Sequence, residues 1–364
     1  MIISSLRTAA FRNLVDAEVS VSAKNVFLVG ENGQGKTNFL EALYFCSYAS
    51  SFRGAHDSEI AQHQKKDFSA AITVIGQPAA RDITGRVLVK FEKGKKAVLI
   101  DGKKAADRRE LLSVLPCIVF CHEDMEFVAG SQERRRWFFD QVLSLYDPVY
   151  LDDLRRYRRS LKSRNSVLRE QPAPQLLDAL DRQCASYGVR LMEKRETAAR
   201  LFSEVFAQLY EEVSGCAGMS VRYAPSWKGA DEEDAVSHLA RRRAADMAAG
   251  ISLSGPHRDR YIFTLGEGEF SSSASTGQRR LLALLLRVAQ ARRYSQTTGR
   301  NPVLLLDDVL LEMDGEKRRR FLSALPLYDQ AFFTFLPEEP YQRYRDGNTL
   351  VYHVRDGRIE PEVV

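Results

Sequence analysis

The stretch "NVFLVGENGQGKTNFLEALYF", residues 25–45, decides the fold of this 364-residue chain. It begins with an apolar run, Val26 to Val29, whose length and following glycine indicate a buried strand. It ends with apolar residues at the spacing of a helix that begins near Lys36. Between them lies a loop that fits G-x-x-x-x-G-K-[ST] without a gap, so the sequence predicts a phosphate-binding loop.

Each part of this loop has a physical role. Glycines allow unusual backbone dihedral angles that turn N–H groups toward an anion, and the positive end of the following helix adds to the attraction. We expect Lys36 to place a charge on the β- and γ-phosphates of ATP as a catalytic residue, and Thr37 to supply a hydroxyl to Mg²⁺. The alternative is a chance glycine turn between a strand and a helix. The candidate nucleotide-binding residues of the loop are Gly30, Glu31, Asn32, Gly33, Gln34, Gly35, Lys36 and Thr37.

Composition narrows the class of protein. Hydrophobic residues make up 44% and charged residues 28%, which is typical of a soluble globular protein. No apolar run approaches the ~20 residues of a membrane span, and the N-terminus has no apolar core of a signal peptide. We therefore expect a cytoplasmic protein with no membrane partner. Cys117, Cys121 and His122 faintly suggest zinc ligands, but "CIVFCH" is typical of a strand and no second ligand pair exists, which favours buried free thiols.

The local sequence pattern changes twice along the chain. Residues 1–106 alternate short strand-like runs with turns, including a hairpin predicted over 87–104. Residues 107–250 are charge-rich and helical, with an antiparallel hairpin whose turn falls at the prolines of 171–174. Strand-like texture returns over 251–364. The sequence therefore predicts an α/β head whose two parts flank a helical insertion.

The second α/β part supplies acids that a phosphate loop needs. In "NPVLLLDDVLLEMD", residues 301–314, an apolar strand ends in two carboxylates. Asp307 is placed to hold Mg²⁺, and Asp308 to orient or deprotonate an attacking water as a catalytic residue. The alternative is a pair of acids that lead into a helix N-terminus, where acids are favoured. The complete upstream loop argues for the first interpretation.

A third segment, "SSSASTGQRRLLALLLRVAQ" (271–290), predicts a helix that opens near Gly277. Serine, glycine and glutamine at its start offer hydroxyls and free N–H groups to an anion. Arg279 and Arg280 oppose the helix dipole in the first turn, which a nearby anion would explain. The alternative is a serine-rich loop that only caps the helix.

Taken in order, these motifs resemble an ABC-type ATPase head of the kind found in SMC-like proteins, whose sequence is split around an arm. Further stretches, spread along nearly the whole chain, are similar to the RecF family. They are "FRNL" (11–14), "GENGQGKTNFLEAL" (30–43), "HEDMEFVAGSQERRRWFFD" (122–140), "LKSRNSVL" (161–168), "GPHRDR" (255–260) and "LLLDDVLLEMD" (304–314).

The resemblance implies further roles. Ser275, Gly277 and Gln278 match the signature motif, which contacts the γ-phosphate of ATP held by the other protomer, and Asp314 matches a loop that crosses the dimer interface. It implies a weak ATPase that forms a homodimer on ATP, binds gapped or junction DNA, and helps RecR and RecO to load RecA. The resemblance also implies a link to replication restart and to the induction of the SOS response.

Four positions depart from the family or leave a role open. Leu311 stands where the family usually has serine, Arg260 replaces an acid in "GPHRDR", and Thr334 stands where transporter heads carry a switch histidine. Gln62 is one candidate for the glutamine that senses the γ-phosphate.

Basic clusters indicate a polyanion partner. The net charge is only +5, but arginine and lysine gather in local blocks, and we expect 134–136 and 155–164 to contact DNA phosphates without sequence preference. For any single block a solvated helix face is the better interpretation, whereas several blocks in one chain favour a polyanion partner. Two alternatives to a DNA clamp stay open: the energy subunit of a transporter, and a structural head with an inactive nucleotide site.

Overall fold

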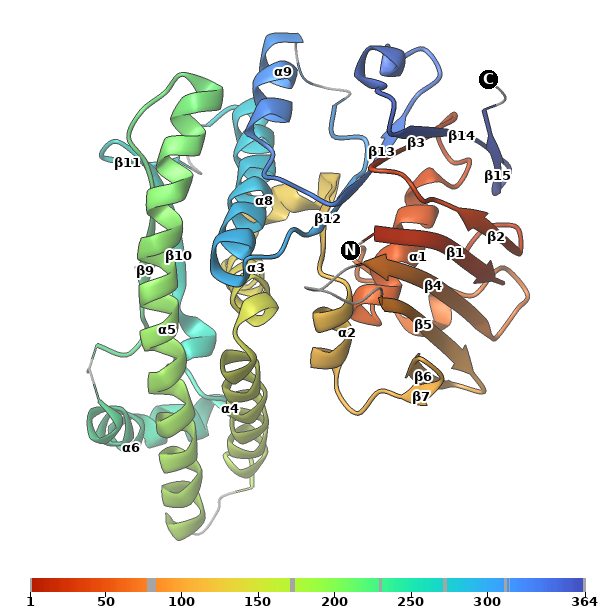
Figure 1. Cartoon of the computed structure of the whole chain (residues 1–364). Coiled ribbons are helices and arrows are strands. Elements are labelled where there is room, and N and C mark those ends of the chain that lie inside the picture. Colours follow the sequence, from red (N-terminus) through yellow and green to blue (C-terminus); the bar gives the residue numbers. More distant parts are fainter. Residues whose placement is uncertain are drawn as a thin grey trace. The chain divides into compact units, whose positions relative to one another are not determined.

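The computed structural model describes residues 2–76, 83–170, 174–228, 231–270, 274–310, 313 and 315–362 (Figure 1). Contacts divide the chain into two units, which are residues 1–123 with 294–364, and residues 124–293. The predicted boundaries near 106 and 250 fall elsewhere, since the division places 107–123 in the first unit and 251–293 in the second. None of the described helices has the length and apolar content to cross a membrane.

The first unit contains a mainly parallel sheet that carries the phosphate loop. Five of its strands are parallel, and β15 pairs antiparallel at one edge. β3, β13, β12 and β8 are buried at every residue, as continuous apolar strands of a covered parallel sheet should be. The order across the sheet is β15 (Arg358–Pro361), β14 (Thr349–Arg355), β3 (Asn25–Val29), β13 (Gln330–Phe335), β12 (Val303–Leu306) and β8 (Cys117–Phe120).

A second, antiparallel sheet completes the first unit. The hairpin predicted over 87–104 is confirmed by the antiparallel pairing of β5 with β6, and Lys93 and Gly94 form its turn with positive φ angles of 50° and 73°. The order is β2 (Ala17–Ser20), β1 (Ile2–Ala9), β4 (Phe68–Gly76), β5 (Ile83–Glu92), β6 (Lys95–Ile100) and β7 (Lys103–Lys104). The helical elements are α1 (Lys36–Tyr48), η1 (Asp57–Glu59), α2 (Arg108–Val114), α9 (Gly315–Ala324) and η4 (Tyr341–Tyr344).

Helix α1 lies in the apolar core of the first unit. It contacts β4 and β5 of the antiparallel sheet and β8 and β13 of the parallel sheet. The rings of Phe11, Phe45 and Phe68 meet edge to face in this core. Cys117 and Cys121 are buried there, and the thiol of Cys117 accepts a hydrogen bond from Ser47 at 3.0 Å. The prediction of buried thiols on this strand is confirmed.

The second unit is helical, with one small sheet. The predicted helical hairpin is confirmed by α4 and α5, which run antiparallel and pack on each other (Figure 1). Helix α8 begins at Thr276, where the sequence predicts a helix start. The elements are α3 (Gln132–Tyr146), α4 (Pro148–Val167), α5 (Pro174–Ser214), β9 (Met219–Ala224), α6 (Glu232–Ala249), η3 (Pro256–Arg258), β10 (Arg260–Leu265) and β11 (Gly268–Glu269), with most of η2 (His122–Phe127) and α8 (Thr276–Thr298). Residues 122–123 of η2 and 294–298 of α8 belong to the first unit.

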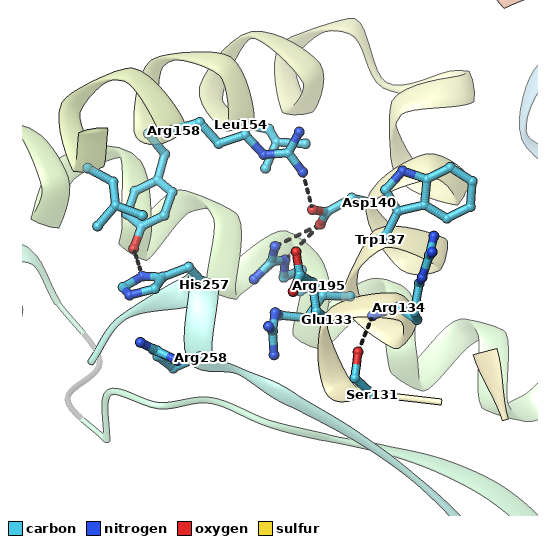
Figure 2. A pocket seen from close by; sticks show the side chains of 13 residues that line it. Ser131, Glu133, Arg134, Trp137, Asp140, Leu154, Arg158, Arg195, His257 and Arg258 are labelled. Atoms are coloured by element: carbon cyan, nitrogen blue, oxygen red, sulfur yellow. Dashed lines mark hydrogen bonds and ion pairs between the residues drawn. The ribbon is translucent and has the colours of Figure 1, made fainter. Parts of the chain in front are cut away.

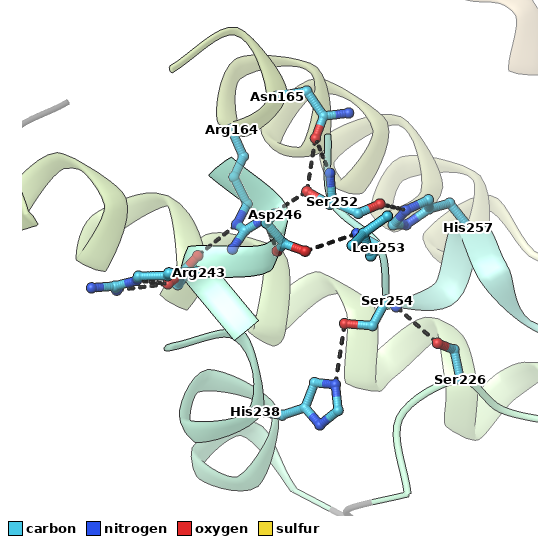
Figure 3. Close-up of polar contacts among 12 residues, drawn as sticks. Arg164, Asn165, Ser226, His238, Arg243, Asp246, Ser252, Leu253, Ser254 and His257 are labelled. Carbon is cyan, nitrogen blue, oxygen red and sulfur yellow. Dashed lines mark hydrogen bonds and ion pairs between the residues drawn. The ribbon is translucent and has the colours of Figure 1, made fainter. Parts of the chain in front are cut away.

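A buried ion network ties α4, α5 and α6 together (Figure 3). The guanidinium of Arg164 donates to Asp181 at 2.6 Å, to Asp246 at 2.7 Å and to Ser252 at 2.7 Å. All three charged side chains have no exposed surface. Asp246 also accepts the backbone N–H of Leu253 at 3.0 Å, so the chain that follows α6 is held by the same group.

Two arginines of the predicted DNA-contacting blocks are therefore structural. Arg164 is enclosed by the network of acids, and Arg135 donates to the carbonyl oxygens of Val128 and Tyr261 in the interior. The prediction that 134–136 and 155–164 reach DNA is wrong for these two residues, because neither side chain is accessible. A block of arginines in a sequence does not show which of its side chains are buried and which are exposed.

We expect Arg164→Met to lower the free energy of unfolding by about 3–5 kcal/mol, because it removes the guanidinium that pairs with buried Asp246 and one of the two that pair with buried Asp181, the other being that of Arg243. Urea denaturation of the full chain measures this loss. The control is Arg200→Met, since Arg200 pairs with Glu204 at the surface and should lose less than about 1 kcal/mol. Equal losses in the two variants would contradict a structural role for the network.

Candidate nucleotide-binding site

The backbone of the phosphate loop explains why glycine stands at three positions. Gly33 and Gly35 have φ angles of 78° and 120°, in a region that side chains disfavour. Gly30 has an ordinary φ, but a Cβ atom there would overlap the carbonyl oxygen of Val354 on β14. The loop is thus folded tightly between the end of β3 and the start of α1.

Lys36 is held at the centre of this loop. Its ammonium donates to the carbonyl oxygens of Gly30 at 2.6 Å and Glu31 at 3.1 Å, and the side chain is 4% exposed. The loop's own carbonyls therefore position the charge where the predicted phosphate site lies. The point-charge role of Lys36 on a phosphate stays a prediction.

The two predicted acids meet the loop at the end of β12. The hydroxyl of Thr37 donates to Oδ1 of Asp307 at 3.0 Å, although 270 positions separate them in the chain. The hydroxyl of Thr334, on β13, lies 3.2 Å from Oδ1 of Asp307 and 2.8 Å from Oδ1 of Asp308. It also accepts the backbone N–H of Asp308 at 2.7 Å. The four residues form one connected polar cluster.

The electrostatics of this cluster suit a cation. The pKa of Asp307 is raised to about 7, chiefly by burial and then by the neighbouring charge of Asp308, while hydrogen bonds from Thr37 and Thr334 act in the opposite direction. A divalent cation beside the two carboxylates would relieve both unfavourable effects. Carboxylate and hydroxyl oxygens are also the hard ligands that Mg²⁺ takes. The donor set therefore fits the predicted Mg²⁺ ligands, Thr37 and Asp307.

The loop and the acids open on one hollow of about 360 Å³ in the first unit. It includes four residues that the sequence analysis did not assign: Asn38, Arg53, His122 and Glu123. The last two follow β8, which is parallel to β12, so the ends of both strands lie at the same sheet edge. The rule that ligands bind at the carboxyl ends of parallel strands would have found them. The lining is Glu31, Asn32, Gly33, Gly35, Lys36, Thr37, Asn38, Arg53, His122, Glu123, Asp307 and Asp308.

Gly30 and Gln34 do not line this hollow and instead hold the loop in place. The carbonyl of Gly30 accepts from Lys36. The side-chain carbonyl of Gln34 accepts the backbone N–H of Asp356 at 2.6 Å, which fixes the turn between β14 and β15 to the loop. Both are positioning residues among the predicted nucleotide-binding set.

The "FRNL" segment supports the loop from the other side. Asn13 donates to the carbonyl oxygen of Gly33 at 3.2 Å and accepts from the amide of Asn38 at 2.7 Å. Its own carbonyl is so near Gly357 that a side chain at that glycine would overlap it. Local sequence pattern predicts no role for Asn13, because it does not show that residues 13, 33 and 357 meet.

The predicted signature residues lie at the start of α8 in the second unit. The hydroxyl of Ser275 accepts the backbone N–H of Gln278 at 3.3 Å, and the side chain of Gln278 accepts the backbone N–H of Ser275 at 2.8 Å. This is a capping box, which is the alternative that the sequence left open. Ser275, Gly277 and Gln278 are all exposed, and contact with ATP remains a prediction for them.

Of the four other positions that the sequence singled out, Asp314 and Leu311 lie outside the described residues. Gln62 follows η1, where its backbone N–H donates to the carbonyl of Ala10, and it is not among the residues that line the hollow. Arg260 is exposed at the start of β10.

Comparisons with known proteins agree with this geometry. A family profile described as "RecF/RecN/SMC N terminal domain" matches residues 2–360. The "DNA replication and repair protein RecF" of Treponema pallidum (strain Nichols) is 45% identical, over 95% of this chain and 97% of that protein. The protein of the same name from Anaeromyxobacter sp. (strain Fw109-5) is 31% identical, over 98% of both.

Two solved structures extend the likeness to the fold. The recombination mediator protein RecF-ATP in the RecFOR pathway superimposes with a TM-score of 0.90 and 25% identity, over 99% of this chain and 97% of that one. An Smc head domain with an extended coiled coil from Pyrococcus furiosus, bound to the C-terminal domain of ScpA, gives 0.56 and 16% identity, over 100% and 96%. The predicted fold class, an α/β ABC-type ATPase head with an inserted helical lobe, is confirmed.

We expect Gly30→Ala to lower the free energy of unfolding by about 1–3 kcal/mol, because the added methyl group would push the loop away from β14. Urea denaturation measures the loss, and a nucleotide titration should show weaker binding in parallel. The control is Gly315→Ala, where a Cβ atom meets nothing within 4 Å. A Gly30→Ala variant as stable as this control would contradict the close packing of loop and strand.

Proposed function

The chain belongs to the RecF family, and we propose that it is an ATP-gated DNA clamp that acts as a mediator of recombinational DNA repair. One observation carries the proposal: the phosphate loop, Thr37 and both acids share a hollow on the first unit, while the signature segment is exposed on the second. The family indicates the ABC-type ATPase class. The polar cluster around Asp307 and Asp308 provides groups that could bind Mg²⁺ and activate water.

The described residues can hold ATP in named roles. The backbone N–H groups of residues 32–37 and the ammonium of Lys36 would bind the phosphates. Thr37 and Asp307 would hold Mg²⁺, which offsets phosphate charge when bound. Asp308, fixed through Thr334, would orient the attacking water and accept its proton. Its side chain is one methylene shorter than glutamate, which supports slow hydrolysis.

We infer that ATP joins two copies of the chain. Ser275, Gly277 and Gln278 of one protomer would contact the γ-phosphate held by the other, and Asp314 would lie at the same interface. ADP lacks those contacts, so only ATP has the differential binding energy that favours the dimer. Hydrolysis would then act as a timer that opens the clamp.

DNA is the proposed partner of the closed dimer. The solved relative is named as a recombination mediator in the RecFOR pathway, and this chain carries exposed arginine on several helices. Such contacts bind phosphates without reading sequence. We propose single-strand to double-strand junctions as the target, RecR and RecO as protein partners, RecA loading as the result, and the cytoplasm as the place.

Light scattering of the full chain tests the central claim. The molar mass should double from 41.2 kDa with ATP, and stay at one protomer with ADP or without nucleotide. Duplex DNA in a second series should bind under the ATP condition. A single-protomer mass under saturating ATP would overturn the clamp.

We expect Ser275→Arg to abolish ATP-dependent dimerisation while ATP binding to the monomer is kept, because a long cation would replace a small hydroxyl at the proposed interface. Sedimentation with ATP measures the first property, and a fluorescent nucleotide titration measures the second. The control is Ser237→Arg, at an exposed position on α6, which should dimerise normally. Dimerisation of the Ser275 variant would remove the signature role.

We expect Asp308→Asn to lower ATP turnover by about 10²-fold or more, because an amide cannot accept the proton of water. The same change should lengthen the lifetime of the ATP dimer. Phosphate release measures turnover, and the mass of the complex after dilution measures lifetime. Normal turnover in this variant would exclude Asp308 from the mechanism.

A further inference from the structure

The second unit contains a cavity of about 790 Å³ that the nucleotide site does not use (Figure 2). It opens between helix α3, one face of helix α4 and the η3 turn. Two stretches that carry the family resemblance meet here, since residues 133–140 and 256–258 both contribute. The lining is Ser131, Glu133, Arg134, Arg136, Trp137, Asp140, Leu154, Tyr157, Arg158, Leu161, Arg195, His257 and Arg258.

Some arginines of this cavity are neutralised by the protein itself. Arg195 donates to Asp140 at 2.7 Å and to Asp259 at 2.8 Å, and Arg158 donates to the same Asp140 at 3.2 Å. Arg136 donates to the carbonyl oxygen of Asp259 at 2.7 Å, and the charges of Asp259, Glu133 and Asp140 act on it. Asp140 and Asp259 are therefore already paired with the inner arginine Arg195, while Glu133 also lines the cavity.

Two arginines have no such partner. Among the described residues, none forms a side-chain hydrogen bond or an ion pair with Arg134 or Arg258, and both side chains are exposed at the cavity. Burial lowers the pKa of the third, Arg136, and the positive charge of Arg195 lowers it further, while the charges of Asp259, Glu133 and Asp140 act in the opposite direction. An anion in the cavity would relieve the repulsion between Arg136 and Arg195.

An aromatic ring stands beside the charges. Trp137 is 36% exposed and lies one turn after Arg134 on α3, so the two side chains are neighbours on the helix surface. Its indole stacks on Phe127 with ring centroids 5.7 Å apart, which holds the ring in place. An exposed, fixed indole next to guanidinium groups suits the stacking of a nucleic acid base.

The turn that carries Arg258 is also fixed. His257 binds the carbonyl oxygen of Ser252 through Nε2 at 2.9 Å, so Nε2 carries the proton and Nδ1 accepts from the hydroxyl of Tyr157 at 2.7 Å. Burial lowers the pKa of His257 to about 4, which keeps the ring neutral and this pattern intact near pH 7. The cavity is therefore held in one arrangement by its own hydrogen bonds.

We propose that this cavity binds one unpaired nucleotide of single-stranded DNA, with the two phosphates that flank it at Arg134 and Arg258 and its base on Trp137. The inference rests on the proposed function in taking DNA as the partner. A paired base in a duplex is stacked between its neighbours and leaves no face for the indole. An acidic peptide would match the arginines but would leave the exposed ring unused.

Tryptophan fluorescence gives a direct readout. The chain has two tryptophans, and Trp227 is 1% exposed, so a ligand that stacks on an indole must reach Trp137. Titration of the full chain with oligothymidylate, with and without ATP, should give saturable quenching. Trp137→Phe should abolish the quenching and weaken binding of the labelled oligonucleotide about tenfold.

The charge is tested by the double variant Arg134→Ser/Arg258→Ser. We expect its affinity for the oligonucleotide to fall more than tenfold at low salt, and its salt slope to fall by about 1.4, which corresponds to two phosphate contacts on a single strand. The matched control is Arg241→Ser/Arg242→Ser, which removes the same charge from an exposed part of α6 in the same unit. ATP-dependent dimerisation should be unchanged in both.

The outcomes separate this inference from the proposed function. If the wild type binds the strand and the pocket variant binds equally well, the cavity is excluded while the clamp survives. If the wild type binds no DNA under any nucleotide condition, both fail. Equal quenching by thymidine monophosphate would assign the cavity to a free nucleotide. Quenching by polyglutamate alone would assign it to an acidic protein. Either result would overturn the proposal that the cavity binds single-stranded DNA.

Discussion

The hydrogen bond from Thr37 to Asp307 is the contact on which the nucleotide site depends. It joins the end of the phosphate loop to a strand near the other end of the chain. It forms because β3, β13 and β12 are parallel neighbours, so their carboxyl ends deliver Thr37, Thr334 and Asp307 to one edge. The sheet cannot be completed until the chain has returned from residues 124–293. Loop-closure cost grows only by about 0.6 kcal/mol for each doubling of length, so a whole folded unit is tolerated between the two halves.

What the sequence predicted reliably is what is local. The phosphate loop, the strand that ends in Asp307 and Asp308, and the helices around the α4–α5 hairpin are each encoded in contiguous residues. His122, Glu123 and Asn13 were missed because their roles depend on strand order and on approach between distant segments. The capping box at Ser275 shows a further limit, since the same two residues satisfy a helix start and a proposed interface, and local pattern does not separate these roles.

The two units are stabilised in different ways. The first has a continuous apolar core around α1, whereas the second places arginine in its interior. Arg164 and Arg195 each bind two carboxylates there, and removal of one partner from such a group is far more costly than its net contribution suggests. This is why blocks of arginine in the sequence did not predict correctly which side chains can reach DNA. In the 155–164 block Arg164 holds helices together, while Arg156 and Arg159 face solvent.

The difference between buried arginines with partners and exposed arginines without them also supports a ligand in the cavity of the second unit. Where this chain uses arginine to stabilise its fold, it supplies acids or carbonyl oxygens at hydrogen-bond distance, as Asp181 and Asp246 do for Arg164 and two carbonyls do for Arg135. Arg134 and Arg258 line this cavity, and none of the described residues forms a side-chain hydrogen bond or an ion pair with them. Exposed ion pairs contribute little to stability, so stability gives no reason to concentrate unpaired charge beside an exposed indole. A ligand that carries phosphate and an aromatic face accounts for both the arginines and the exposed indole. Because the cavity lies within one protomer, such a ligand could bind it without ATP-dependent dimerisation.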